Sequence, residues 1–212
     1  MKKEIAIFGG TGRTGKIFLE KALQAGYRVK VLARTPEKLG LDHTNLTVVK
    51  GDVLNAENVK KTLEGTSMVF SLFGHVKGSP AHLQTEGTRL IVSAMRDNQQ
   101  KRIISLSGGG LPFPEKDEPK FADKMIRTIM KIFVPKVLND AIDHAEVLKN
   151  SDLKWTIVRG PRLTDDPEQG QYREGWVGVN ASTKISRADL ASFLLTLIED
   201  EKYVREMPFI SH

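Results

Sequence analysis

Short apolar runs alternate with segments of helical spacing through the first half of the chain. Each run is rich in β-branched and other apolar residues, and the runs cover residues 4–8, 28–33, 46–51, 67–73 and 102–107. Strand, helix and strand in repetition predict a parallel sheet with helices on both of its faces. At 212 residues, the chain is the size of one domain. We therefore expect an α/β fold, a single doubly wound parallel sheet that takes in residues 1–212.

The second half is less regular and contains an expected insertion at about residues 118–134. There Phe121, Met125, Ile129 and Phe133 recur at four-residue steps, the spacing of one face of a helix. This face could serve as a lid over a site, as part of the core or as a dimer element, and the sequence leaves these three alternatives open. The opposite face is basic and carries Lys120, Lys124, Arg127 and Lys131. It could attract an anionic substrate or a membrane surface, but we expect it to be solvated.

The composition narrows the class of protein and its chemistry. The formal net charge is +6, a modest basic excess that fits a phosphorylated cofactor or plain solubility. No apolar stretch approaches the roughly 18 residues needed to cross a bilayer. The chain has no cysteine, which excludes disulfides, thiolate metal sites and cysteine nucleophiles. We expect a cytoplasmic protein, a monomer or homodimer, with no metal, no integral membrane contact and no nucleic acid as a partner.

A glycine-rich loop follows the first predicted strand and opens the first predicted helix. Its glycines stand at Gly9, Gly12 and Gly15, three residues apart. In a dinucleotide site, one glycine allows a tight turn, the next lets the backbone approach a pyrophosphate, and the last lets helix and strand pack closely. A Walker-type phosphate loop would end in Gly-Lys-Ser/Thr, whereas here Lys16 is followed by Ile17. The loop therefore predicts an NAD(P) site.

The residues after the second predicted strand bear on the choice between NAD and NADP. An NAD site carries an acidic residue about 20 positions beyond the glycine loop, whereas this chain has Arg34, with Lys38 one turn further on. A guanidinium can clamp a 2′-phosphate through charge-assisted hydrogen bonds. Arg13, in the loop, could join it from the other side. NADP is therefore favoured over NAD, although a merely solvated Arg34 would leave both cofactors possible.

Two further strand ends lie where such a sheet binds its ligand, outside the carboxyl ends of the strands. Asp52 and Val53 follow the third strand. The first can accept a hydrogen bond from the adenine amino group and the second can pack on the ring. Leu72, Phe73 and Gly74 follow the fourth strand, and we expect them beneath the nicotinamide ribose.

Motifs along nearly the whole chain resemble those of one family. They are AIFGGTGRTG, QAGYRVKVLAR, VVKGDVL, TEGTRLIVSAM, SDLKWTIVRGPRL and ISRADLASFLL. They are similar to the atypical short-chain dehydrogenases called NAD(P)-binding or NmrA-like proteins, and among these to the biliverdin-IX-beta reductase and flavin reductase branch. The resemblance implies a Rossmann domain that binds NADPH and reduces flavins or linear tetrapyrroles. By position it implies these cofactor-binding residues: Gly9, Thr11, Gly12, Arg13, Thr14, Arg34, Lys38, Asp52, Val53, Leu72, Phe73, Gly74 and Ser107.

The catalytic residues are less well defined than the cofactor site. Typical short-chain dehydrogenases pair a tyrosine with a lysine four residues later, and none of Tyr27, Tyr172 and Tyr203 has that partner. Hydride transfer to a flavin needs no such pair, because solvent can supply the proton and the protein need only stack the two rings. Ser107, at the end of the fifth strand, and His75, after the fourth, are the candidate catalytic residues.

One departure from the reductase branch bears on the substrate. Ser107 is followed by Gly108 at the position of that branch's active-site serine, which argues against a biliverdin reductase proper. The expected function is hydride transfer from NADPH to a small-molecule acceptor of the flavin, tetrapyrrole or quinone type. The alternative is an NADP(H)-binding redox sensor or regulatory protein without catalysis, as in some NmrA-like proteins.

Overall fold

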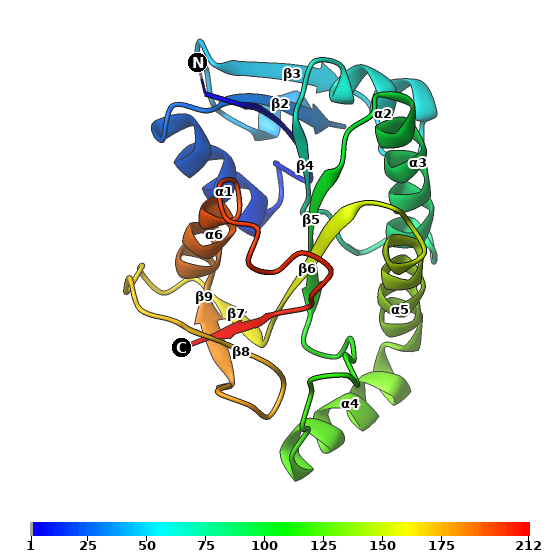
Figure 1. Ribbon diagram of the computed structural model, residues 1–212, viewed down its shortest axis with the longest axis vertical. Helices are drawn as coiled ribbons and strands as arrows, with labels where there is room; N and C mark the ends of the chain where they lie inside the picture. Colours follow the sequence, from blue (N-terminus) through cyan, green and yellow to red (C-terminus); the bar gives the residue numbers. More distant parts are fainter. Residues whose placement is uncertain (1) are drawn as a thin grey trace.

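An eight-stranded sheet forms the centre of the molecule, which the computed structural model describes from residue 2 to residue 212 (Figure 1). Its strands are β1 (Glu4–Phe8), β2 (Arg28–Ala33), β3 (Leu46–Lys50), β4 (Met68–Ser71), β5 (Arg102–Gly108), β6 (Lys154–Gly160), β8 (Arg173–Gly175) and β10 (Phe209–Ser211). Their order across the sheet is β3-β2-β1-β4-β5-β6-β10-β8. Neighbouring strands are parallel except β10 and β8, which are antiparallel. The strand order reverses between β1 and β4, which makes that point the topological switch of the sheet.

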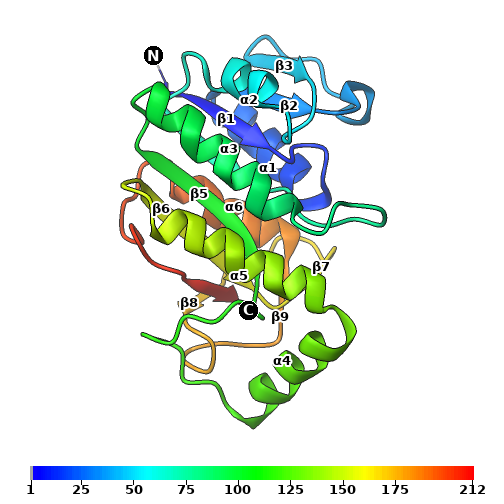
Figure 2. The same ribbon diagram turned by 90° about the vertical axis from the view of Figure 1, so that its right-hand side faces the viewer.

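Helices cover both faces of the sheet, as Figures 1 and 2 show. On one face lie α1 (Arg13–Gln24) and α6 (Arg187–Thr196), and on the other lie α2 (Ala56–Leu63), α3 (Leu83–Asp97) and α5 (Pro135–Lys149). This arrangement confirms the predicted α/β fold with a doubly wound parallel sheet. Within residues 2–212, no helix combines the length and the apolar character that crossing a membrane requires.

Strand β1 illustrates how one strand serves two cores. Successive side chains of a strand point to opposite faces of the sheet. Ile5 and Ile7 pack in the core that includes α1 and α6, whereas Ala6 and Phe8 pack in the core that includes α2, α3 and α5. All four are buried. A strand that is buried on both faces gives a continuous apolar run, which is the pattern seen in the first half of the sequence.

Smaller elements build the part of the molecule beyond β5 and β6. Strands β7 (Arg162–Thr164) and β9 (Lys184–Ser186) form a separate parallel pair. Helix α4 (Phe121–Phe133) projects from the body at the foot of Figure 1 and continues into α5 at Pro135. None of the residues of α4 is buried, so this helix is not part of the core.

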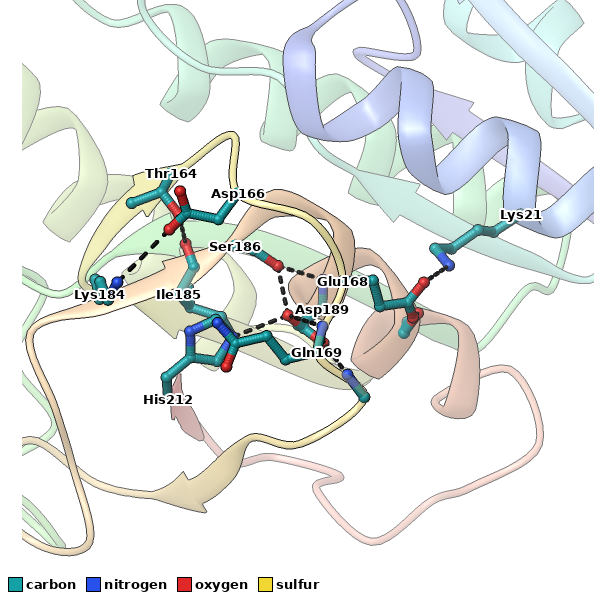
Figure 3. A network of polar contacts seen from close by, with 12 residues as sticks. Lys21, Thr164, Asp166, Glu168, Gln169, Lys184, Ile185, Ser186, Asp189 and His212 are labelled. Carbon is teal, nitrogen blue, oxygen red and sulfur yellow. Dashed lines mark hydrogen bonds and ion pairs between the residues drawn. The ribbon is translucent and has the colours of Figure 1, made fainter.

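A buried carboxylate, that of Asp189 near the start of α6, holds the smaller elements together (Figure 3). It accepts hydrogen bonds from the backbone N–H groups of Gln169 and Gly170, at 3.1 and 2.8 Å, and from His212 at 2.9 Å. Ser186 caps α6 by accepting from the Asp189 N–H, and its hydroxyl donates to the Asp189 carboxylate. Burial alone would raise the pKa of Asp189, but these hydrogen bonds lower it below its ordinary value. Serine and histidine both bond the carboxylate here, which is an anchoring arrangement and not a catalytic triad.

Candidate functional site

A pocket of about 160 Å³ opens at the carboxyl ends of β1, β2, β3 and β4. It therefore lies at the switch point, where sheets of this topology bind their ligands. Of the predicted cofactor residues, the structure brings together Gly9, Thr11, Gly12, Arg34, Asp52, Val53, Leu72, Phe73 and Gly74. The lining is completed by residues that were not among the predicted cofactor-binding residues, namely Phe8, Leu32, Gly51, Val76 and Leu83. Most of these residues lie at or just beyond the end of a strand, close to a predicted cofactor-binding residue. Their position in the sequence could therefore have indicated that they line the pocket.

The glycine spacing of the loop has a steric cause. Gly9 has a φ of +91°, which L side chains rarely adopt, and a Cβ there would lie 2.5 Å from the backbone N of Phe73. A Cβ on Gly15 would lie 2.1 Å from the Gly9 carbonyl oxygen. Gly12 is the N-cap of α1, and within the described chain neither a capping side chain nor an acid in the first turn occupies that helix end. The N–H groups there can therefore bind an anion.

Arg34 is the predicted cation that reaches this pocket. Its side chain is 62% exposed, and its Nη1 lies 3.9 Å from a carboxylate oxygen of Asp52, too far for a strong hydrogen bond. Two other predicted cations lie outside the pocket lining. Arg13 forms an ion pair with Asp165, and Lys38 is exposed at the end of the short 3₁₀ helix η1 (Pro36–Lys38). The guanidinium of Arg34 is thus available to a ligand in the pocket.

Thr14 and Gly15 were also predicted to belong to the cofactor site. The structure places both in the first turn of α1, where they are buried and do not line the pocket. Gly15 packs against Gly9 on the side of the loop away from the pocket, where only a glycine leaves enough room. These two positions shape the loop, while the residues before them face the pocket.

His75 follows the pocket-lining residues of the fourth strand end but is held by a buried acid. Its Nε2 donates to the carboxylate of Asp140 at 2.6 Å, and Asp140 has no exposed surface. The same carboxylate accepts from the backbone N–H groups of Gln84 and Thr85, at 2.7 and 2.9 Å, at the start of α3. Burial alone would raise the pKa of Asp140, but hydrogen bonds from Thr85, Gln84 and His75 lower it. His75 therefore ties its loop to α3 and α5, and it lines neither of the two cavities described here.

Ser107, the other candidate catalytic residue, lies on β5 outside both cavity linings. Its Oγ is buried and has no hydrogen-bond partner within residues 2–212. Nearby on the same strand, Ser105 Oγ lies 3.1 Å from Nε2 of the buried His144, whose Nδ1 lies 2.8 Å from the Ala141 carbonyl oxygen. Nδ1 therefore donates and Nε2 accepts, and burial lowers the pKa of His144, which keeps the ring neutral.

A second and larger cavity, of about 610 Å³, opens at the carboxyl ends of β5 and β6. Much of its lining is apolar and comes from Leu111, Pro112, Met130, Val177 and Phe209. The three glycines after Ser107 differ in their surroundings. A Cβ on Gly109 would lie 2.7 Å from the Phe209 ring, and one on Gly110 would lie 2.6 Å from Sδ of Met130. A Cβ on Gly108 would meet nothing within 4 Å, so the cavity has room at the position of the missing serine.

Helix α4 lines part of this cavity, but not with the apolar stripe that its four-residue spacing predicted. The contributing residues are Asp123, Lys124, Ile126, Arg127 and Met130. Phe121, Met125 and Ile129, from the apolar stripe, are instead 83, 50 and 47% exposed. The expectation of a wholly solvated basic face is wrong for Arg127, because the helix is turned so that this side chain faces the cavity.

A buried arginine on β6 fixes the loop that borders the second cavity. Arg159 is fully buried, and its two Nη atoms lie 2.7 and 2.8 Å from the two carboxylate oxygens of Asp117. It also donates to the carbonyl oxygens of Leu111 and Met207, at 2.8 and 2.9 Å. Sequence reasoning missed this pair because its members lie 42 residues apart. The available signal was an arginine inside an apolar run, since a buried charge needs a partner.

Comparison with known proteins identifies the family. A sequence model of the NAD(P)H-binding family matches residues 9–201, most of the chain, so the chain belongs to that family. The prediction of an NAD(P)H-binding Rossmann fold is confirmed. Among curated proteins, the uncharacterized protein YwnB of Bacillus subtilis is 25% identical over 219 residues, which cover 96% of this chain and 95% of YwnB.

Two solved structures share the fold over nearly their whole length. One is a short-chain dehydrogenase/reductase of Veillonella parvula in complex with NADP, with a TM-score of 0.79 and 20% identity over 100% of this chain and 95% of that one. The other is a Streptococcus pneumoniae protein proposed to be an NADH-flavin reductase, with a TM-score of 0.79 and 20% identity over 99% of both chains. At such identities the likeness establishes the fold.

Proposed function

We propose that this member of the NAD(P)H-binding family is an NADPH-dependent oxidoreductase that passes a hydride to a flavin or to a similar flat aromatic or quinone-like acceptor. The observation that carries the proposal is the presence of two cavities at the carboxyl edge of one sheet. The first lies at β1 to β4 and the second at β5 and β6. The first has the loop and the cation of a dinucleotide site, and the second is wide and largely apolar.

In this proposal the first pocket holds NADPH, which supplies a hydride when bound. The loop from Gly9 to Gly12 and the N-terminus of α1 bind the pyrophosphate, because no side chain caps the helix there and its N–H groups stay available. Arg34 binds the 2′-phosphate, which gives NADPH its advantage over NADH. Asp52 and Val53 contact the adenine, and Leu72, Phe73 and Gly74 border the nicotinamide half.

The second cavity orients the acceptor, with its ring against the apolar wall and its reactive edge near Gly108. The tyrosines offer no proton donor to a carbonyl substrate, because Tyr27 and Tyr203 bond Glu199 and Glu174 and none of the three tyrosines lines either cavity. A flavin or quinone needs no such donor, since it gains two electrons with the hydride and takes a proton from solvent. Proximity and orientation then supply the rate enhancement.

The resemblance to the flavin reductase branch supports a flavin as the acceptor, and so does the proposed activity of the Streptococcus pneumoniae neighbour. The open space at Gly108 adds to this support, because a broad ring system can occupy it. A linear tetrapyrrole would fit the same apolar wall.

One observation favours the alternative, an NADP(H)-binding redox sensor. Phe121, Ile132 and Phe133 of α4 are 83, 67 and 76% exposed, and a cluster of exposed apolar side chains marks a contact surface in many proteins. A sensor would use such a surface to report the state of its cofactor to a partner.

NADPH oxidation with flavin mononucleotide as acceptor separates the two functions. We expect a rate well above the protein-free control, and we expect it to vanish in Gly15→Ala, because the added Cβ displaces the loop at Gly9. Cofactor affinity is measured separately by calorimetry. Tight NADPH binding with a rate equal to the protein-free control would rule out the reductase and leave the sensor.

A further inference from the structure

The second cavity has an excess of cationic over acidic side chains. Its lining includes the cations Lys124, Arg127 and Arg162 and the carboxylates Asp117 and Asp123. Lys124 and Arg162 are exposed and stay solvated, whereas Arg127 is half-buried, and an unpaired polar group that is removed from water costs free energy. The partners of these five groups therefore decide what the cavity can bind.

Both carboxylates are already engaged. The two oxygens of Asp117 pair with Arg159 at 2.7 and 2.8 Å, and Asp123 accepts from the backbone N–H of Lys120 at 2.9 Å. The three cations of the cavity, by contrast, form no ion pair within residues 2–212. Because a backbone N–H does not cancel the charge of Asp123, three cations stand against this one carboxylate, and the lining within residues 2–212 keeps a net positive charge.

Arg127 is the cation whose side chain reaches furthest out of solvent at the cavity. Its Nε is buried and has no hydrogen-bond partner in the part of the chain that the structure describes. On the same helix, Phe121 and Phe133 are 83 and 76% exposed. Helix α4 thus turns Arg127 toward the cavity together with Ile126 and Met130, while its two phenylalanines face outward. A ligand that accepts a hydrogen bond from Arg127 would remove the cost of its unpaired N–H.

Arg162 is exposed and lies on a short strand pair. It is the first residue of β7, in register with Lys184 of β9, and the Asp189 network anchors this pair (Figure 3). Arg162 interacts electrostatically with the carboxylate of Asp166. The pKa of Asp166 is lowered chiefly by a hydrogen bond from Thr164, at 2.9 Å, and less by Lys184 and Arg162. Arg162 forms no ion pair with it and retains its donors for the cavity.

From this charge balance we infer that the acceptor carries an anionic group, a phosphate, carboxylate or sulfonate, which Arg127 and Arg162 bind. The planar fork of a guanidinium matches such oxyanions, and two of them hold the acceptor in a fixed orientation along the apolar wall. The inference rests on the proposed function, because it assigns the second cavity to the acceptor. It concerns binding alone and adds no chemical step.

Flavin mononucleotide and riboflavin test the inference, because they share one ring system and differ by a phosphate. NADPH is kept saturating, so that the first pocket is occupied and the flavin phosphate cannot bind there. We expect kcat/KM for flavin mononucleotide to exceed that for riboflavin roughly tenfold or more, mainly through KM. Arg127→Gln should bring this ratio close to one. Lys131→Gln removes one positive charge from an exposed residue of the same helix outside the cavity lining, and it should keep the ratio.

Equal kcat/KM values for the two flavins in the unmodified protein would overturn the inference, and so would equal effects of Arg127→Gln and Lys131→Gln. If neither flavin is reduced, the proposed function fails, and binding decides the inference by itself. Titration of each flavin, followed by its fluorescence in the presence of NADP⁺, should then show tighter binding of flavin mononucleotide and loss of this preference in Arg127→Gln. Equal affinities would overturn the anion site. Arg162→Gln serves as the second variant if Arg127→Gln fails to fold.

Discussion

Replacing Asp117 by alanine should release the loop that borders the second cavity. In the folded protein, Asp117 pairs with both Nη atoms of the buried Arg159 and accepts from the backbone N–H groups of Phe113 and Val177, at 2.7 and 3.1 Å. Alanine offers none of these acceptors. The guanidinium keeps only its bonds to the carbonyl oxygens of Leu111 and Met207. A charge at a fully buried position is then left without its counterion.

The magnitude follows from that burial. Removing one partner of a buried ion pair costs about 3–5 kcal/mol, because the remaining charge stays desolvated and uncompensated. In a chain of 212 residues, each kcal/mol lowers the melting temperature by roughly 2–4 °C, so we expect a fall of about 6–20 °C. The exposed pair of Lys101 and Asp152 supplies the control, with side chains 58 and 61% exposed. Asp152→Ala should change the melting temperature little, because an ion pair that is exposed to solvent contributes little to stability.

Calorimetry and urea titration of both variants measure the difference. The assay for function is the kinetics with flavin mononucleotide, in which Asp117→Ala should lower kcat/KM while the Kd for NADPH stays near that of the unmodified protein. If Asp117→Ala does not fold, Asp117→Asn retains the shape and removes the charge. Equal losses of stability in Asp117→Ala and Asp152→Ala would refute the reasoning, because burial would then play no part.

The remaining predictions address the cofactor, the acceptor and pH. Arg34→Asp should raise the Kd for NADPH, measured by calorimetry, about tenfold or more and should change the Kd for NADH much less. Equal affinities of the unmodified protein for the two cofactors would contradict the role assigned to Arg34. Gly108→Leu should fold normally, since a Cβ there meets nothing within 4 Å, yet it should lower kcat/KM for the acceptor without changing NADPH affinity. The pKa of buried His144 is lowered, so below about pH 6.5 the unfolded state gains a proton that the native state does not, and the free energy of unfolding should fall as the pH drops. His144→Gln should flatten this dependence in urea titrations, and an unchanged slope would exclude His144 as its source.

The fold was predictable because its signal is local. Each buried strand of the first half stands in the sequence as a short apolar run, and the glycine loop marks the first turn. The predicted ends of the strands were less accurate where the chain leaves the sheet to line a pocket. The run at residues 67–73 was read as one strand, but β4 ends at Ser71, because Leu72, Phe73 and Gly74 leave the sheet to line the first pocket. The three-residue strands β7, β8, β9 and β10 are too short to produce a periodic pattern.

The second cavity was not predictable in the same way, because long-range pairs create it. Arg159 reaches Asp117 across 42 residues, and the orientation of α4 depends on Gly110, where a side chain would strike Met130. Periodicity correctly gave α4 an apolar and a basic face, but it could not tell which side would face the protein. That choice depends on tertiary contacts, and it placed Arg127 in the lining of the second cavity, although a solvated basic face was the expectation from the sequence.

The two cavities therefore depend on different parts of the chain, and this has a consequence for mutation. Backbone loops directly after β1 to β4 build the first pocket, so its shape depends on steric exclusion at positions such as Gly9 and Gly15. Inserted and C-terminal segments build the second, and the buried carboxylates of Asp117 and Asp189 anchor them. Because these anchors do not line the first pocket, the proposed function predicts that substitutions around the second cavity change the preference for the acceptor and leave the affinity for NADP(H) unchanged.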